Sequence, residues 1–148
     1  MYLIHFPTAI DMLLSRHEKQ HKMKIGILRE TKTPPDHRVP LSPQQCAQVK
    51  NQYPNVELVV QPSPIRKFVD TEYKACGIQL QEDLNDCDIL IGVKEVKIDT
   101  LISGKTYLFF SHTFKFQPYN AKLLKALLDR KIRLVDYEVI KAPSGKRL

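Results

Sequence analysis

Two short apolar runs, Ile89–Val93 and Tyr107–Phe110, most constrain what this chain can fold into. Both are rich in β-branched or aromatic residues, and turn-forming residues border them. Short continuous runs of this kind are typical of strands that are buried on both faces of an α/β sheet. We therefore expect both runs to be strands of one such sheet.

Each run ends abruptly in polar residues that can handle protons. Lys94 and Glu95 follow the first run, and His112 and Lys115 follow the second. Ligands of open α/β sheets bind in the crevice beyond the carboxyl ends of the strands, so these side chains are expected to face one crevice. The alternative is that the strands simply end in polar loops, where such residues are common.

The rest of the chain alternates between strand and helix patterns. We predict further strands at 24–28, 56–60 and 132–135, and helices from 43, at 70–75 and at 118–130. Strands that alternate with helices indicate an α/β fold with a mostly parallel, doubly wound sheet, in three layers as in flavodoxin-like or Rossmann-like domains.

Two of the helices have features that can be checked. Ser42 is a predicted N-cap, with Pro43 at the first helical position and Gln45 completing a capping box. Arg38 lies shortly before this helix, where a guanidinium and free N–H groups would together hold a carboxylate; a solvated loop arginine is the alternative. In the later helix we expect a buried stripe formed by Leu124, Leu127 and Leu128.

Composition narrows the class of partner. The 148 residues amount to one domain with enough apolar content, 43%, for a core, and the formal net charge is +7. A basic chain suits nucleic acid or anionic metabolites. Lys and Arg are scattered without a basic block, so we expect small anionic substrates and no nucleic acid.

No run is long enough to predict a membrane span. The three cysteines lack CxxC spacing, which favours reduced thiols in a cytosolic-type compartment.

Residues 1–22 differ from the remainder and are interpreted as an N-terminal extension, with the folded domain at 23–148. They lack the features of a secretory signal. His17-Glu18-Lys19-Gln20-His21 matches the HExxH zinc pattern. That chemistry needs a buried helix and a further ligand, whereas this copy lies in a charged segment, so we predict no metal site.

Phosphate-binding motifs are absent from the sequence. Gly104-Lys105-Thr106 ends like a P-loop, but Asp99 occupies the place of the required glycine, and the stretch precedes a strand. No two glycines are separated by one residue, so there is no GxGxxG. We expect no dinucleotide site in this chain.

Four segments taken together carry a family resemblance. RE…HRVPLSP, GVKE, KTYLFFSHT-K and IRLVDYE resemble the amino-terminal domain of the alanine dehydrogenase and pyridine nucleotide transhydrogenase superfamily. The pattern is more similar to the lysine–oxoglutarate reductase branch, the lysine-forming saccharopine dehydrogenases. The resemblance covers about residues 24–148.

The resemblance implies a two-domain enzyme in which this domain supplies the substrate site and a following Rossmann domain binds NAD or NADP. It implies catalytic roles for Lys94 and His112. It also implies substrate-binding roles for Arg38, Lys115 and Glu138, with Glu95 as a further carboxylate beside the catalytic lysine. Thr113-Phe114-Lys115 after the histidine favours saccharopine over alanine chemistry.

The implied reaction joins lysine and 2-oxoglutarate to form saccharopine, with proton transfers at nitrogen and oxygen that suit a lysine and a histidine. A cytoplasmic location, or the mitochondrial matrix in a eukaryote, is expected, and a homo-oligomer stays open. Two alternatives remain: an alanine dehydrogenase-type domain, and a stand-alone α/β ligand-binding module without catalysis.

Overall fold

The computed structural model describes residues 22–146. The HExxH segment lies outside the described residues. The strands are β1 Met23–Ile27, β2 Val56–Val60, β3 Gln79–Leu80, β4 Ile89–Ile91, β5 Thr106–Phe109 and β6 Arg133–Asp136. The α-helices are α2 Pro43–Gln52, α3 Asp70–Ala75 and α4 Ala121–Asp129. Short 3₁₀ turns cover Ile98–Thr100, Thr113–Lys115, Pro118–Asn120 and Tyr137–Val139.

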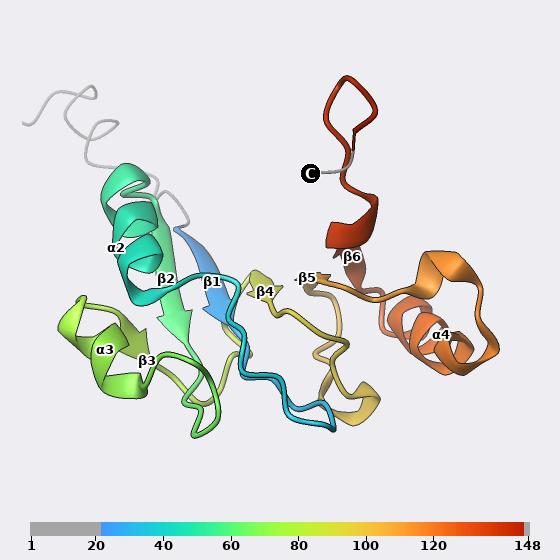
Figure 1. Ribbon diagram of the computed structural model, residues 1–148, viewed down its shortest axis with the longest axis horizontal. Helices are drawn as coiled ribbons and strands as arrows, with labels where there is room; N and C mark the ends of the chain where they lie inside the picture. Colours follow the sequence, from blue (N-terminus) through green and yellow to red (C-terminus); the bar gives the residue numbers. More distant parts are fainter. Residues whose placement is uncertain (1–21, 147–148) are drawn as a thin grey trace, which may run out of the picture.

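The six strands form one sheet in the order β3-β2-β1-β4-β5-β6 (Figure 1). Every neighbouring pair is parallel. The prediction of a mostly parallel sheet is therefore confirmed. Strand order reverses between β1 and β4, and such a switch point is where ligands of open α/β sheets bind, outside the carboxyl ends of the strands.

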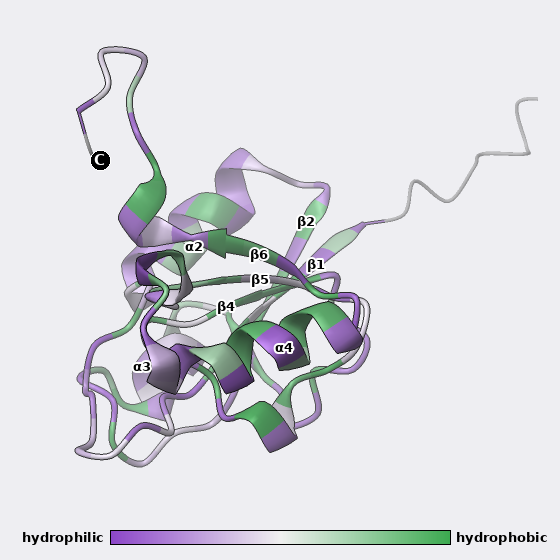
Figure 2. Ribbon diagram, turned by 90° about the vertical axis from the view of Figure 1, so that its right-hand side faces the viewer, coloured by the Kyte–Doolittle hydropathy of each residue, from purple (hydrophilic) through white to green (hydrophobic). Residues whose placement is uncertain are grey.

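Helices cover both faces of the sheet, which confirms the three-layer prediction. Figure 2 shows α4 in front of the sheet and α2 behind it. On the α4 side, Leu123 and Leu127 pack in one buried cluster with sheet residues such as Tyr107 and Phe109. On the other side, a second cluster joins Cys46 of α2 and Tyr73 of α3 to Ile27, Leu58 and Val60.

The start of α2 has the predicted capping box. The Ser42 hydroxyl accepts the Gln45 N–H at 3.3 Å, and the Gln45 side chain accepts the Ser42 N–H at 2.9 Å. Pro43, at the first helical position, has no N–H to offer. The capping box thus satisfies two of the N–H groups at this terminus internally, and the expectation that the terminus helps Arg38 to hold a carboxylate stays a prediction.

The stripe predicted for α4 is wrong in part. The α-helix begins at Ala121, after a 3₁₀ turn, rather than at Pro118. Leu123 and Leu127 are its buried leucines, at 6% and 3% exposure, whereas Leu128 is 70% exposed. Leu123 and Leu127 are four residues apart and share one helical face, and the 3₁₀ turn decides which face meets the sheet.

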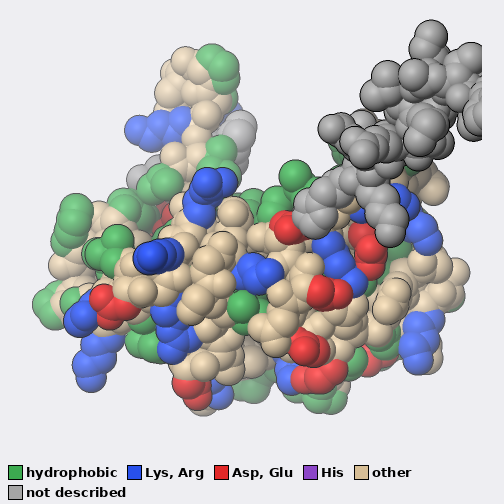
Figure 3. Space-filling view, turned by 180° about the vertical axis from the view of Figure 1, so that it is seen from behind, with side chains coloured by type: hydrophobic (Ala, Val, Ile, Leu, Met, Phe, Trp, Pro, Cys, Tyr) green, Lys and Arg blue, Asp and Glu red, His purple; other side chains and the backbone are tan. Residues whose placement is uncertain are grey.

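Charges of both signs lie side by side on the surface. In the view from behind, Lys and Arg side chains are interspersed with Asp and Glu (Figure 3). Between residues 22 and 146, no helix combines the length and apolar character that a membrane crossing requires. The same residues contain no group of three or more His, Cys, Asp or Glu side chains placed to hold a metal ion.

Candidate active site

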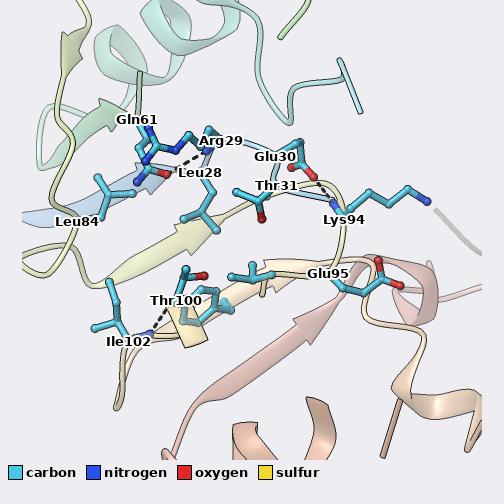
Figure 4. Close-up of a pocket in the computed structure, with 13 residues that line it drawn as sticks. Leu28, Arg29, Glu30, Thr31, Gln61, Leu84, Lys94, Glu95, Thr100 and Ile102 are labelled. Atoms are coloured by element: carbon cyan, nitrogen blue, oxygen red, sulfur yellow. Dashed lines mark hydrogen bonds between the residues drawn. The ribbon is translucent and has the colours of Figure 1, made fainter. Parts of the chain in front are cut away.

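The exits of β1 and β4 are joined through a buried carboxylate. Glu30, three residues past β1, accepts the N–H groups of Val93 at 2.7 Å and Lys94 at 3.0 Å. Figure 4 shows Glu30 beside the backbone from which the Lys94 side chain extends. Burial raises the pKa of Glu30, against the opposing effect of the two N–H groups. Glu30 thus fixes the backbone that carries Lys94.

Sequence reasoning missed Glu30 as part of this site. Its only signal is a carboxylate directly after a central strand, because its partners lie 63 and 64 residues away. Glu30 lies close to Gly92, where an added Cβ would make an ordinary van der Waals contact of 3.5 Å with Glu30 Oε1.

Hydrogen bonds continue from β4 to β5 and β6 along the same edge. The Phe110 N–H donates to the Val93 carbonyl at 3.0 Å, and the Ser111 N–H donates to Asp136 Oδ2 at 3.1 Å. Lys94 and His112 therefore follow the carboxyl ends of adjacent strands, β4 and β5, as expected.

Four of the predicted site residues lie in one ionic cluster, which extends to Lys32. His112 Nδ1 lies 2.6 Å from Glu138 Oε2, and His112 Nε2 lies 3.8 Å from Glu95 Oε1. Lys115 Nζ is 2.8 Å from Glu138 Oε1, and Lys32 Nζ is 2.5 Å from Glu95 Oε2. Basic and acidic side chains thus alternate from Lys32 to Lys115. We name this set the His112 cluster.

The two carboxylates of the His112 cluster are ionised at neutral pH. Hydrogen bonds from Lys115 and His112 lower the pKa of Glu138. Burial acts to raise the pKa of Glu95, but the Lys32 hydrogen bond outweighs it together with further charges, and the net shift is downward. An ionised carboxylate only accepts hydrogen bonds, so His112 Nδ1 is the donor to Glu138. Lys115 Nζ also lies 3.4 Å from Nδ1, but the Glu138 contact is much shorter, at 2.6 Å. In its neutral form the imidazole therefore carries its proton on Nδ1 and leaves Nε2 as the acceptor, on the side of Glu95.

Lys94 and Arg38 are not in the His112 cluster. The Lys94 side chain extends away from the wall that Gln61 and Leu84 form (Figure 4). Within residues 22–146 its ammonium group has no hydrogen bond or ion pair. The Arg38 guanidinium contacts Asp36, with Nε 3.0 Å from Oδ1 and Nη2 2.6 Å from Oδ2.

Asp36 is a partner of Arg38 that neither alternative for this residue included, and both alternatives stay predictions. The hydrogen bond from Arg38 is the main reason that the pKa of Asp36 falls to about 2, and the positive charge of Lys94 contributes. The Arg38 side chain is still 58% exposed. It is therefore oriented by a carboxylate of its own loop and keeps one side open to solvent.

An open groove adjoins this part of the site. Its volume is about 870 Å³, far larger than the cavity of about 120 Å³ between Glu30 and Lys94 in Figure 4. Apolar side chains make most of its wall. They include Val39, Ile91, Val93 and Phe110, and Arg38 and Lys67 also line it.

The described residues do not fit a dinucleotide. A pyrophosphate site needs a glycine-rich turn that leads directly into free N–H groups of a helix N-terminus. Here fifteen residues, 28–42, separate β1 from α2, and α2 begins with a proline inside a capping box. No step of the chemistry below is assigned to a dinucleotide bound by these residues.

Comparison with known proteins places the chain in a family. The family model of the N-terminal domain of alanine dehydrogenase/PNT matches residues 26–148. Alpha-aminoadipic semialdehyde synthase of Arabidopsis thaliana is 37% identical over 139 residues, which cover 89% of this chain and 13% of that protein. Alanine dehydrogenase 2 of Staphylococcus aureus is 32% identical over 127 residues, 82% of this chain and 33% of that protein.

Solved structures agree at the level of the fold. An L-alanine dehydrogenase matches 84% of this chain and 35% of its own, with a TM-score of 0.68 and 19% identity. A transhydrogenase from Sinorhizobium meliloti matches 80% of this chain and 36% of its own, with a TM-score of 0.65 and 16% identity. The chain thus spans about a third or less of the length of each of these proteins. It belongs to the family of alanine dehydrogenase/PNT N-terminal domains.

Proposed function

We propose that residues 23–148 form the substrate-binding and proton-transfer domain of an NAD(P)-dependent amino-acid oxidoreductase, acting on lysine and 2-oxoglutarate to give saccharopine. The observation that carries the proposal is the His112 cluster at the carboxyl edge of β4, β5 and β6, beside Lys94. Three side chains to which the resemblance assigns roles, those of His112, Lys115 and Glu138, lie there in contact with Glu95, which follows the strand pattern 89–93.

The cluster supports proton transfer at stated atoms. Formation of saccharopine joins the lysine amine to a ketone, loses water and is completed by reduction of the resulting imine. His112 Nε2 is the open acceptor of a neutral imidazole and can take a proton from the amine or return one to oxygen. Lys94 Nζ has no internal partner among the described residues and serves as the second proton-carrying group. The nicotinamide cofactor supplies the hydride, and a separate domain holds it.

The groove favours lysine over alanine as the amino-acid substrate. Its apolar wall suits the four methylene groups of a lysine side chain, which bury readily along such surfaces. Arg38 lines the groove with its guanidinium partly open, and a planar guanidinium recognises a carboxylate through paired hydrogen bonds. Alanine would fill little of this space. The relatives named alpha-aminoadipic semialdehyde synthase support the same choice.

The proposal extends to the location of the protein and to its nicotinamide cofactor. Alpha-aminoadipic semialdehyde synthase of Rattus norvegicus, 37% identical over 128 residues, carries "mitochondrial" in its name, which supports the mitochondrial matrix for a eukaryotic form of this domain. For any other source we propose a cytoplasmic location. Whether NAD or NADP is used depends on the residue of the nucleotide-binding domain that contacts the 2′ position of the ribose.

The proposal is tested by assaying a polypeptide that contains this domain together with a nicotinamide-binding domain. We expect oxidation of reduced nicotinamide with lysine plus 2-oxoglutarate, and much slower oxidation with pyruvate plus ammonia. Omitting lysine is the matched control, because 2-oxoglutarate alone gives no imine. Faster turnover of pyruvate and ammonia would overturn the lysine assignment.

The alanine dehydrogenase-type alternative rests on one observation, the 32% identity to the S. aureus enzyme. Under that alternative the same assay shows pyruvate and ammonia as the better pair. Absence of turnover with either pair would favour the non-catalytic ligand-binding module.

A further inference from the structure

Asp136 is a buried carboxylate that the proposed chemistry does not use. It ends β6 and is 7% exposed. Its neighbours in the sequence give no sign that it differs from any other polar residue at the end of a strand. Its surroundings are polar and equally buried, since Ser111 is 0% and Asn120 5% exposed.

The Asp136 carboxylate binds the two segments that carry His112 and Glu138. Its Oδ2 accepts the Ser111 N–H at 3.1 Å, the Ser111 hydroxyl at 2.5 Å and the His112 N–H at 3.2 Å. Its Oδ1 accepts the Glu138 N–H at 2.9 Å. One side chain therefore fixes the backbone of both partners of the 2.6 Å contact between imidazole and carboxylate.

His112 needs this support because of its backbone conformation. Its φ of 56° and ψ of 8° are left-handed, a region that residues other than glycine rarely adopt. Asn120 holds the opposite side of the same residue, since its side-chain amide donates to the His112 carbonyl at 3.1 Å. Such conformations persist where the surroundings over-determine them, and they cluster at functional sites.

We propose that Asp136 is a positioning residue that holds the His112 imidazole against Glu138 and thereby fixes the Nδ1–H tautomer. The catalytic meaning of that tautomer rests on the proposed function, whereas the positioning does not. A carboxylate suits the task because it has no hydrogen atoms, so that both oxygens accept. An asparagine of the same shape must turn an NH₂ group toward either the Glu138 N–H or the N–H groups of Ser111 and His112.

The test is ¹⁵N NMR of the imidazole nitrogens in the 148-residue chain, at a pH where the ring is neutral. His112→Gln assigns the signals by their disappearance. We expect the unmodified chain to show a protonated Nδ1 and an unprotonated Nε2. Asp136→Asn should shift the ring toward the Nε2–H form that free histidine prefers. Asp129→Asn is the control, because it neutralises an exposed aspartate on α4 that is paired only with Lys125.

Retention of the Nδ1–H form in a folded Asp136→Asn variant would overturn the positioning role. If that variant does not fold, Ser111→Ala gives the same readout, because it removes the hydroxyl donor at 2.5 Å and leaves the backbone N–H groups in place. An unchanged tautomer in folded Ser111→Ala would then count against the role, and a shifted one would support it.

A kinetic measurement separates this inference from the proposed function. In a polypeptide with both domains, Asp136→Asn should lower kcat by at least about tenfold, with the KM for 2-oxoglutarate nearly unchanged. A tautomer shift without a kinetic effect supports the positioning by Asp136 and counts against the proposed role of His112. Activity lost with the tautomer intact counts against the positioning alone.

Discussion

Arg38 and Asp36 show how a residue suited to a ligand is prepared by its own loop. The carboxylate contacts one side of the guanidinium, through Nε and Nη2, and leaves the rest toward solvent. The Arg38 backbone N–H also donates to Asp36 Oδ1 at 3.0 Å, so the loop is closed on itself. Because Asp36 already restricts the Arg38 side chain, binding of a substrate carboxylate, as proposed above, would cost that side chain less conformational entropy.

The same pair predicts a pH dependence of stability. The pKa of Asp36 falls from 3.8 to about 2 on folding, so its contribution to the free energy of unfolding is present above 3.8 and is lost as the pH falls toward about 2. Asp36→Asn should therefore lower stability near neutral pH and flatten its decline in acid. Urea denaturation across this range measures the effect, with Asp129→Asn as the control. Parallel pH profiles for Asp36→Asn and the unmodified chain would contradict it.

At the scale of the elements, several predictions from local patterns are confirmed, although the buried stripe of α4 is not among them. The capping box of α2, the strand Val56–Val60 and the short helix Asp70–Ala75 match their expected residues because their signals lie within a few positions of each other. The strand β3 was missed, since two residues carry no periodicity.

The site shows the same division between local and distant signals. Polar residues after two buried strands were enough to predict that Lys94, Glu95 and His112 meet one edge. The resemblance, rather than any spacing, supplied Glu138, whereas the position of Arg38 shortly before a helix had already suggested a carboxylate-binding role. Glu30 and Asp136 were not predicted, because their hydrogen bonds span 63 and 25 residues and leave no pattern in the chain.

The two leucines at the end of α4 give a direct test of helix orientation. Leu127→Ala should destabilise the fold by about 2–5 kcal/mol, because it opens a cavity in the cluster around Tyr107 and Phe109. Leu128→Ala removes a side chain that is 70% exposed and should cost no more than about 0.5 kcal/mol. Thermal or urea unfolding of both variants compares the same substitution at adjacent positions. Equal losses would contradict the helix orientation described here.

At the scale of the whole molecule, the strand order is that of a dinucleotide-binding sheet without its phosphate-binding turn. The carboxyl ends of the strands, where a dinucleotide-binding sheet holds pyrophosphate, are instead followed by Glu30, Lys94 and the His112 cluster. The topology thus places Glu30 and Lys94 at the switch point between β1 and β4, with the His112 cluster beside them at the exits of β5 and β6.

This arrangement predicts that residues 1–148 alone bind neither NADH nor NADPH measurably at submillimolar concentrations. The reason is physical: the α2 terminus is capped, and no glycine-rich turn precedes it. Titration of nicotinamide fluorescence checks the prediction, with a polypeptide that includes a nicotinamide-binding domain as the positive control. A micromolar dissociation constant for the chain alone would reveal a nucleotide site that the fold does not explain.

The central claim is that Lys94 and His112 carry protons for the reaction. Its most direct test is the turnover number of Lys94→Met and His112→Gln in a polypeptide with both domains, assayed with lysine and 2-oxoglutarate. Lys122→Met, an exposed lysine on α4, is the matched control. We predict that each site variant loses roughly 10²–10⁴-fold in kcat, the usual contribution of a positioned proton-transfer group, with the affinity for reduced nicotinamide unchanged. Near-normal turnover in either variant would contradict the claim for that residue.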